Sequence, residues 1–356
     1  MEIGIVGLPN VGKSTLFNAL TSANAQASNY PFTTIEPNVG VVAVPDSRLN
    51  RLSEIFKPKK QTPASVRFVD IAGLVKGASS GEGLGNKFLS HIREVDAILM
   101  VVRLFKDSDV THVMGGVSPE RDVSVIETEL ILADLASLEK QKEKLFGKAK
   151  SGDKASRELL ESLETVKAVL DSGSPARTAP IDAKTLAAFS LLTTKPVLFV
   201  GNTDEKPDPA LVAELETLAK KRGAQSLTLC SKIESEIVEL PMEERTVFLQ
   251  EMGIKNTGLE RVILAAYEIL GLCSYFTAGE DEVRAWTIPV GAKGPQAAGV
   301  IHTDFEKGFI RAEVYSFKDI DQHLKESVLR EKGLIRSEGK DYVVKDGDVC
   351  FFKFAP

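Results

Sequence analysis

One glycine-rich motif near the start of the chain constrains the fold more than any other feature. It reads Gly7-Leu8-Pro9-Asn10-Val11-Gly12-Lys13-Ser14, matches G-x-x-x-x-G-K-[ST], and stands between an apolar run (3–6) and a helix-like stretch (14–21). In such a loop the backbone N–H groups turn inward on phosphates, the lysine neutralises the β and γ oxygens, and the serine holds Mg²⁺. The motif therefore predicts an α/β nucleotide-binding fold, with nucleotide contacts from Asn10, Val11, Gly12, Lys13, Ser14 and Thr15.

The chain divides into three regions that differ in their pattern of apolar and polar residues. Short apolar segments alternate with helix-like stretches over the first 270 residues or so, which indicates a mostly parallel sheet covered on both faces. Apolar residues at helical spacing from about 123 to 170 predict an antiparallel helical hairpin with its tip at 147–153. From about residue 275, short Val, Ile and Phe strands separated by glycines predict a small mixed-β module.

A second motif, Asp70-Ile71-Ala72-Gly73, follows the apolar strand 66–69. A carboxylate at the carboxyl end of a buried strand behind a phosphate loop is where such proteins support Mg²⁺, so Asp70 is expected to be a metal residue together with Ser14. The glycine-rich stretch 73–85 is either a segment ordered by the γ-phosphate or a plain loop. One of the threonines of Thr33-Thr34 is a further candidate for the Mg²⁺ shell, the alternative being a strand edge.

The candidate base-reading motif is Gly201-Asn202-Thr203-Asp204-Glu205, about 130 residues after Asp70. Two βαβ crossovers need only about 60 residues, so the surplus marks the helical hairpin as an insertion into the nucleotide domain. Guanine is read by N-K-x-D, but here Thr203 replaces the lysine and Glu205 the aspartate. The substitution favours ATP over GTP, with Ser231 in the loop that backs the base.

The residue that would orient the attacking water is missing from its usual place. Leu74 follows the Asp70 motif where many of these enzymes carry a glutamine, and an apolar side chain cannot position water. His112 lies in a polar loop after the strand 97–102, on the ligand side of the sheet, and is the candidate catalytic residue beside Lys13. A single loop histidine is also often a bystander.

Composition limits the remaining possibilities. The 356 residues include 44 basic and 50 acidic ones, and a net charge of −6 argues against a surface that coats nucleic acid as a whole. The cysteines lack C-x-x-C spacing, which favours reduced thiols in the cytoplasm. We find no signal peptide and no apolar run long enough to span a bilayer, so no membrane partner is expected.

Lysines concentrate near the expected hairpin tip and form either a phosphate-binding patch or an ordinary solvated helix surface. They are Lys140, Lys142, Lys144, Lys148, Lys150 and Lys154. Several aromatic residues of the C-terminal module stand at strand-like positions and are expected in the core rather than as base-stacking platforms. They are Trp286, Phe305, Phe309, Phe351 and Phe354.

Taken together, the motifs resemble those of the Obg-like ATPase (YchF) family over the whole chain. The resemblance rests on 7–15, 30–37, 70–85, the departure at 202–205, 275–279 and the run 297–311. It implies a Ras-like P-loop nucleotide domain at 1–274, interrupted by a coiled-coil arm at 123–193, and a C-terminal β-grasp TGS domain at 275–356.

The resemblance also bears on the site. It favours Thr34 as the Mg²⁺ threonine, supports His112 in hydrolysis, and places Asn10 where relatives hold a monovalent cation, which raises K⁺ as a second cofactor.

The resulting interpretation is a cytoplasmic Mg²⁺-dependent ATPase with slow intrinsic turnover that acts as a nucleotide-controlled switch. The expected partner is the large ribosomal subunit or the whole ribosome, bound through the basic arm tip and the TGS domain. Two alternatives stay open, an Obg-type GTPase and a nucleotide-gated scaffold for RNA or protein with incidental turnover.

Overall fold

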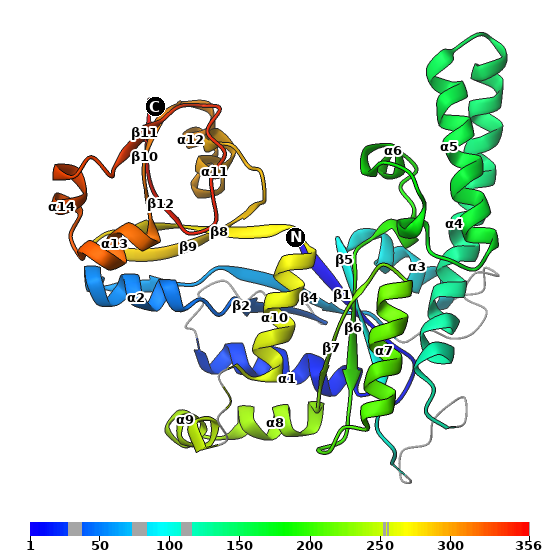
Figure 1. The fold of residues 1–356 in the computed structure, drawn as a ribbon, viewed down its shortest axis with the longest axis horizontal. Helices are drawn as coiled ribbons and strands as arrows, with labels where there is room; N and C mark the ends of the chain where they lie inside the picture. Colours follow the sequence, from blue (N-terminus) through cyan, green and yellow to red (C-terminus); the bar gives the residue numbers. More distant parts are fainter. Residues whose placement is uncertain (28–37, 73–83, 108–115, 252–253, 255, 356) are drawn as a thin grey trace. The chain divides into compact units, whose positions relative to one another are not determined.

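The computed structural model describes residues 1–27, 38–72, 84–107, 116–251, 254 and 256–355. The chain forms two compact units, one from Met1–Val41 and Arg67–Val262 and the other from Val42–Val66 and Ile263–Pro356 (Figure 1). The unit boundaries fall within β2, β4 and α10, so single elements pass from one unit into the other.

The first unit is built on a sheet with the strand order β2-β4-β1-β5-β6-β7. Its central pairs, from β4 through β7, are all parallel, as the apolar runs predict. Residues of β5 are buried without exception, because helices cover both faces of a parallel sheet. The strands are β1 (Glu2–Val6), β2 (Val39–Ala43), β4 (Ser65–Asp70), β5 (Ala97–Arg103), β6 (Val197–Asn202) and β7 (Gln225–Leu229).

Most helices of this unit alternate with those strands along the chain. The helices are α1 (Lys13–Ala27), α3 (Leu84–Glu94), α4 (Pro119–Lys150), α5 (Lys154–Asp171), α6 (Ala183–Ala188), α7 (Pro209–Lys221), α8 (Ser231–Glu239), α9 (Met242–Glu251) and α10 (Gly258–Ile269). Two short 3₁₀ turns, η2 (Ala176–Thr178) and η3 (Leu192–Thr194), lie between α5 and β6. The parallel α/β architecture expected from the sequence is confirmed.

The helical hairpin inserted between β5 and β6 consists of α4 and α5, which lie side by side and project from the sheet (Figure 1). The first helix begins earlier than its apolar pattern, because the Ser118 hydroxyl accepts a hydrogen bond from the Arg121 N–H and Pro119 occupies the first helical position. It also continues through Gly147 to Lys150, so the turn itself is limited to 151–153. An apolar seam that includes Leu138, Leu163 and Val166 holds the two helices together.

A buried ion cluster anchors the base of this arm. Glu127 on α4 accepts from the Arg177 guanidinium at 2.5 Å and lies 3.3 Å from Nε of Arg222, the C-cap residue that follows α7. Burial lowers the pKa of Arg177, although the carboxylate of Glu127 opposes that shift. Removal of one of these three residues would leave a buried charge without its partner, which is strongly destabilising. The cluster therefore holds α4 at a fixed position against the segments that contain Arg177 and Arg222.

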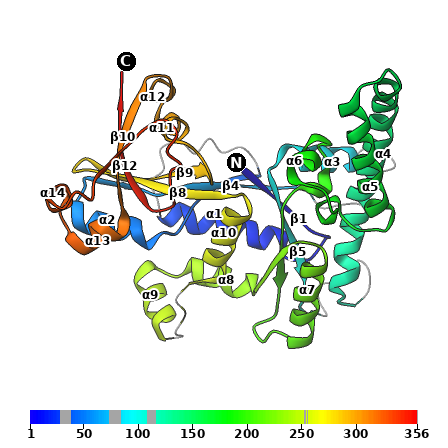
Figure 2. The ribbon, with the colours of Figure 1, turned by 45° about the horizontal axis from the view of Figure 1, so that its top comes forward.

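The second unit contains a mixed sheet with the order β11-β10-β12-β8-β9-β3. Figure 2 shows β10 and β12 running across the direction of β8 and β9. Strands β8 and β9 form an antiparallel ladder, and α11 and α12 cover a core around Tyr275 and Phe352. The elements are α2 (Ser47–Phe56), β3 (Lys60–Thr62), β8 (Leu272–Ala278), β9 (Glu282–Pro289), α11 (Gly294–Ile301), α12 (Thr303–Lys307), β10 (Phe309–Ser316), α13 (Phe317–His323), α14 (Glu326–Glu331), β11 (Arg336–Glu338) and β12 (Asp348–Phe354).

Residues 42–66 belong to this second unit, whereas the sequence prediction places them in the nucleotide domain. Strand β3 adds to the edge of β9 in parallel register, and Arg48 on α2 pairs with Asp346 at 2.7 Å. The Arg48 guanidinium also lies over the Phe276 ring at 5.3 Å. The unit is therefore assembled from two separate stretches of chain rather than from 275–356 alone.

Within the part of the chain that the structure describes, no helix is long and apolar enough to cross a membrane. Cys273 and Cys350 are buried, Cys230 is half-buried, and all three are free thiols, as expected from their spacing.

Candidate nucleotide-binding site

The glycine-rich loop connects the buried strand β1 to α1, which begins at Lys13. Gly12 has a φ of +92°, a backbone conformation that favours glycine, and a Cβ there would meet Nδ2 of Asn202 at 2.1 Å. Gly7 is constrained as well, because a Cβ on it would lie 2.9 Å from the Val101 carbonyl oxygen. Both glycines of the motif are thus required by the packing of the loop against β5 and β6.

Lys13 and Asp70 meet at the carboxyl ends of the adjacent parallel strands β1 and β4. Their side chains form an ion pair and are largely shielded from solvent. The predicted phosphate lysine and the predicted metal carboxylate therefore share one corner of the site. Ser14, the other predicted metal residue, lies exposed in the first turn of α1 beside Thr15.

Asn202 joins the phosphate loop to the loop that follows β7. Its Nδ2 donates to the Val11 carbonyl oxygen at 3.0 Å, and its Oδ1 accepts from the Ser231 N–H at 2.9 Å. The second bond satisfies one of the free amides at the start of α8. Since Asn202 is buried, it acts as a fixed bracket between the loop that holds phosphates and the loop expected to back the base.

The base side of the site contains the other residues of the 202–205 motif. Thr203 is buried, and both its N–H and its hydroxyl donate to the Leu229 carbonyl oxygen, at 2.8 and 3.2 Å. Glu205 is exposed and lies 3.8 Å from the ammonium group of Lys232. The carboxylate that would read guanine in N-K-x-D proteins is thus one methylene longer and faces a lysine.

Ser231 carries a polar atom without a partner. Its hydroxyl oxygen is buried and makes no hydrogen bond to any described residue. Buried polar groups are nearly always paired, so an orphaned hydroxyl on the wall of a cavity indicates a place where a ligand supplies the partner.

These residues surround a cavity of about 990 Å³, which is large enough for a nucleoside triphosphate. Its lining includes Asn10, Gly12, Lys13, Ser14 and Thr15 from the phosphate loop and Asn202, Thr203, Glu205 and Ser231 from the base side. The structure therefore brings together these predicted contact residues, and Val11 joins them through its carbonyl bond to Asn202.

Arg103 is a site residue that the sequence reasoning missed. It ends the buried strand β5 and donates to the carbonyl oxygens of Asn10, Phe105 and Asp107, at 3.4, 3.1 and 3.3 Å. Its guanidinium also stacks on the Phe105 ring at 4.2 Å. The sequence did contain one indication of this role, because Arg103 is the one charged residue in the apolar strand β5 and stands at its carboxyl end. Arg103 ties the phosphate loop to the 104–107 loop, two residues of which line the cavity.

Three predicted residues lie outside the described part of the chain. They are Thr34, Leu74 and His112.

Comparison with known proteins gives consistent matches. A family model described as a 50S ribosome-binding GTPase matches residues 2–126, and the C-terminal YchF GTPase model, described as a protein of unknown function, matches residues 272–355. The chain is 52% identical over 362 residues to the Bacillus subtilis ribosome-binding ATPase YchF, with 99% of both chains covered. It is also 52% identical over 359 residues to the ribosome-binding ATPase YchF of Escherichia coli O157:H7, again with 99% coverage of both.

Solved structures agree with this assignment. The Schizosaccharomyces pombe YchF GTPase superposes with a TM-score of 0.88 at 39% identity, covering 99% of this chain and 97% of that one. A GTP-binding protein from Pyrococcus horikoshii gives a TM-score of 0.63 at 19% identity over the full length of both chains, which supports the fold alone.

Proposed function

Since this chain belongs to the YchF family, whose curated members are named ribosome-binding ATPases, we propose that it hydrolyses ATP to ADP and phosphate with Mg²⁺ and acts as a nucleotide-controlled switch on the ribosome. The observation that best supports ATP binding and hydrolysis is the pair of hydrogen bonds made by the Asn202 side chain. It holds the phosphate loop and the base-side loop around one cavity of nucleotide size.

The phosphate end of the cavity provides positive charge and backbone donors. The first N–H groups of α1, those of Lys13, Ser14 and Thr15, have no partner within the helix and therefore suit phosphate oxygens. Asn10, Val11 and Gly12 of the loop are proposed to contact the nucleotide beside them. Lys13 stabilises the charge that develops on the transferred phosphoryl group, and binding of phosphate there competes with its ion pair to Asp70. Lys13 therefore has both a binding and a catalytic role.

The donor set at this corner fits Mg²⁺. The Ser14 hydroxyl and the Asp70 carboxylate are hard oxygen ligands, and Thr34 would add a third. Among the residues that the structure describes, no group of three or more His, Cys, Asp and Glu residues could hold a metal by itself. This fits an ion that is bound by few side chains and by nucleotide phosphates. When bound, Mg²⁺ neutralises charge on the phosphate oxygens.

Potassium is a separate part of the proposal. Asn10 has a φ of +64°, and its carbonyl oxygen accepts from Arg103, so the backbone of the loop is fixed at the position where a monovalent cation would be held. ATP turnover measured in KCl and in NaCl at equal ionic strength tests it. Equal rates in the two salts would remove K⁺ from the mechanism.

The choice of ATP follows from the base side. Guanine recognition needs a carboxylate that accepts from N1–H and the amino group, whereas adenine presents an amino donor beside a ring acceptor. Glu205 is longer than aspartate and faces Lys232, and Thr203 directs both of its donors to Leu229. Asn202, Thr203, Glu205 and Ser231 are proposed to surround the adenine, with the free hydroxyl of Ser231 as a direct contact.

His112 is proposed to place the attacking water, because Leu74 cannot. Loss of such a group affects the chemical step more than binding. We therefore expect His112→Ala to slow single-turnover ATP hydrolysis by a factor on the order of 10² while ATP affinity is kept. An unchanged single-turnover rate would exclude the histidine.

Ribosome binding is proposed to involve the arm and the C-terminal unit, with the large subunit or the whole ribosome as the target. Only part of the lysine cluster remains available, because Lys142 pairs with Glu164 at 2.6 Å and Lys154 lies 3.8 Å from Glu158. Lys140, Lys144 and Lys148 form no ion pair with any described residue and recur at i, i+4 and i+8 along α4. Like charges at this spacing repel, and a polyanion would relieve that repulsion.

One experiment tests the whole proposal. The purified chain is titrated with ATP and GTP in competition and then sedimented with ribosomes in the presence of ATP, ADP or no nucleotide. We expect tighter ATP binding and nucleotide-dependent sedimentation. Tight GTP binding with negligible ATP affinity would overturn the nucleotide assignment, and sedimentation that ignores nucleotide would overturn the switch.

A further inference from the structure

An exposed aromatic side chain on the sheet of the C-terminal unit stands out from its neighbours. Phe351 on β12 is 63% exposed, whereas Cys350 and Phe352 on either side are buried in the core beneath α11 and α12. Successive residues of a strand point to opposite faces of a sheet, so Phe351 belongs to the face that those helices leave open. The expectation that Phe351 lies in the core is therefore wrong.

Charged residues lie on the same face of the sheet as this ring. In the antiparallel ladder of β10 and β12, Arg311 lies opposite Lys353 and Glu313 lies opposite Phe351, so all four side chains share one face. The Lys353 ammonium is 6.0 Å from the centre of the Phe351 ring and 2.8 Å from the Glu313 carboxylate. Arg330 on α14 adds a further cation, 3.6 Å from that carboxylate.

We call Arg311, Glu313, Arg330, Phe351 and Lys353 the Phe351 patch. Three cations share one carboxylate, which leaves these five residues with net positive charge. The Glu326 carboxylate also lines the adjoining cavity, where it accepts a hydrogen bond from the Tyr315 hydroxyl at 2.5 Å. The side-chain hydrogen bond from Lys353 lowers the pKa of Glu313, so the carboxylate stays ionised and can act only as a hydrogen-bond acceptor at neutral pH.

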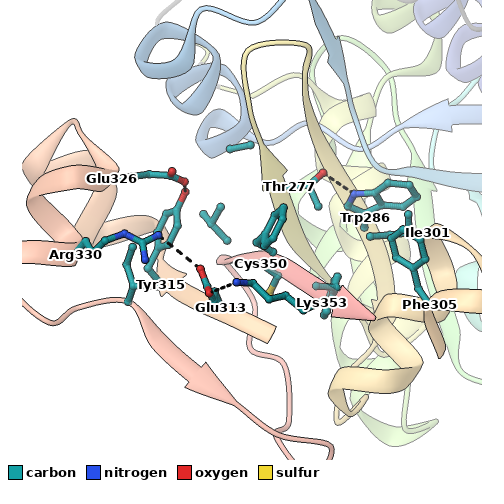
Figure 3. Close-up of a pocket in the computed structure, with 15 residues that line it drawn as sticks. Thr277, Trp286, Ile301, Phe305, Glu313, Tyr315, Glu326, Arg330, Cys350 and Lys353 are labelled. Carbon is teal, nitrogen blue, oxygen red and sulfur yellow. Dashed lines mark hydrogen bonds and ion pairs between the residues drawn. The ribbon is translucent and has the colours of Figure 1, made fainter. Parts of the chain in front are cut away.

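The patch opens onto a cavity of about 660 Å³ within the same unit. Strands β12 and β8 are joined by one residue pair, Val349 with Phe276, and the cavity lies where they diverge. Figure 3 shows Trp286 and Phe305 on one side of the cavity and Glu313 and Arg330 on the other. An apolar, partly aromatic wall thus faces a polar rim that includes Lys353.

We propose that the Phe351 patch binds an unpaired nucleotide of ribosomal RNA, with the base stacked on Phe351 at the mouth of the cavity and the phosphate held by Lys353 and Arg330. Glu313 accepts a hydrogen bond from an amino group of the base. The proposal rests on ribosome binding as the function and names one surface and one chemical class of partner for it.

The charge of the patch decides between RNA and protein as the occupant. An exposed ring on a sheet face, flanked by cations, is the arrangement that stacks bases in single-stranded RNA. The net positive charge complements phosphate, whereas an apolar peptide strand would have to desolvate three cations. Duplex RNA cannot present a free base face, so single strands are the preferred ligand.

The first test uses the full-length chain and a fluorescein-labelled single-stranded RNA of about eight nucleotides, followed by fluorescence anisotropy. We expect Phe351→Ala to weaken binding by about tenfold, which corresponds to about 1.4 kcal/mol, and Phe351→Trp to keep it. Ile310→Ala is the matched control, because Ile310 is 57% exposed in the same unit but is not part of the patch. Thermal unfolding and the ATPase rate should be the same in all variants.

The salt dependence of RNA affinity distinguishes the contribution of base stacking on Phe351 from that of the phosphate contacts. For single strands, the slope of log K against log salt is about 0.7 for each phosphate that the protein neutralises. We therefore expect Lys353→Ala to reduce the slope by about that amount, whereas Phe351→Ala leaves the slope unchanged and lowers affinity at every salt concentration.

Photo-crosslinking identifies the occupant on the ribosome itself. A benzophenone side chain introduced by Phe351→p-benzoylphenylalanine should crosslink to ribosomal RNA. Crosslinking to a ribosomal protein, or equal RNA binding by wild type and Phe351→Ala, would overturn the proposal while leaving ribosome binding intact. If the wild type does not sediment with ribosomes, the proposed function fails, and the anisotropy result still decides whether the patch binds single-stranded RNA.

Discussion

The bracket formed by Asn202 allows a quantitative prediction. Asn202→Ala would leave the Val11 carbonyl oxygen and the Ser231 N–H without their partners in a buried setting. Each such group costs about 1–3 kcal/mol, so we expect the free energy of unfolding to fall by about 2–6 kcal/mol. For a unit of this size, at about 2–4 °C per kcal/mol, that corresponds to a midpoint lower by about 4–24 °C. ATP affinity should also fall by about tenfold or more, because the phosphate loop loses its tie to the base side.

Thr203→Val is the matched control for this experiment. Thr203 is the next residue and is also buried, but the acceptor of its hydroxyl, the Leu229 carbonyl oxygen, keeps the Thr203 N–H as a donor. The control should therefore cost only about 0.5–1.5 kcal/mol. Differential scanning fluorimetry and isothermal titration with ATP measure both effects. Equal losses in the two variants, or unchanged ATP affinity in Asn202→Ala, would refute the bracket as the element that organises the site.

Four further predictions follow from other contacts. Ser231→Ala should leave the melting temperature of the free chain unchanged, because its hydroxyl has no partner among the described residues, but should weaken ATP binding several-fold in calorimetry. Thr203→Lys combined with Glu205→Asp should shift selectivity towards GTP by at least about tenfold in competitive titration, because the pair rebuilds the guanine-reading residues. Lys353→Ala should raise the Glu313 pKa towards its ordinary value in an NMR titration, because the Lys353 hydrogen bond is the largest cause of its lowering. A depressed carboxylate pKa contributes stability that is lost as pH falls through the folded-state pKa, so this variant should also lose less stability on acidification. Truncation after residue 274 should give a chain that aggregates in size-exclusion chromatography, because β3 and the buried Leu49 and Leu52 of α2 lose the strands they pack on.

The phosphate end of the site could be predicted from the sequence because its chemistry is local. Gly7, Gly12, Lys13 and Ser14 lie within one short segment, and the strand before it and the helix after it are visible in the apolar pattern. Asp70 could be placed beside them because parallel neighbouring strands end at the same edge of a sheet. Backbone periodicity and one motif were sufficient for this corner.

The base side could be predicted only as a set of residues, not as a network. The spacing identified Asn202 and Ser231 as candidates. It did not reveal that the Asn202 side chain accepts a hydrogen bond from the Ser231 N–H at the start of α8 and donates one to the Val11 carbonyl oxygen. Such bonds depend on side-chain rotamers and on the register of β6 against its neighbours. Arg103 was missed for a related reason, since its acceptors are backbone carbonyls that carry no sequence signature.

The order of elements in the sequence does not predict which segments make up the C-terminal unit. Residues 39–44 look like one more strand in an α/β alternation, and nothing local in 47–56 distinguishes α2 from a helix that covers the parallel sheet. The difference lies in partners almost 300 residues away, such as Asp346 for Arg48 and Asp321 for Arg51. The edge strand β3, the packing of Leu49 and Leu52 of α2 against β8 and β9, and these long-range ion pairs together place 42–66 in this unit.

The distribution of surface charge could not be predicted from the sequence either. The lysines near the arm tip form a strongly positive cluster in the sequence, yet α5 brings Glu164 alongside Lys142 of α4, and Lys154 lies near Glu158 one turn further along α5 itself. In the C-terminal unit the sequence shows no cluster at all, because Arg311, Arg330 and Lys353 are far apart along the chain and meet only around Glu313. A hairpin tends to neutralise a run of one sign, whereas a sheet can concentrate dispersed charges on one face. The surfaces that meet an anionic partner therefore have to be read from the fold, and the Phe351 patch is one that sequence clustering alone would not reveal.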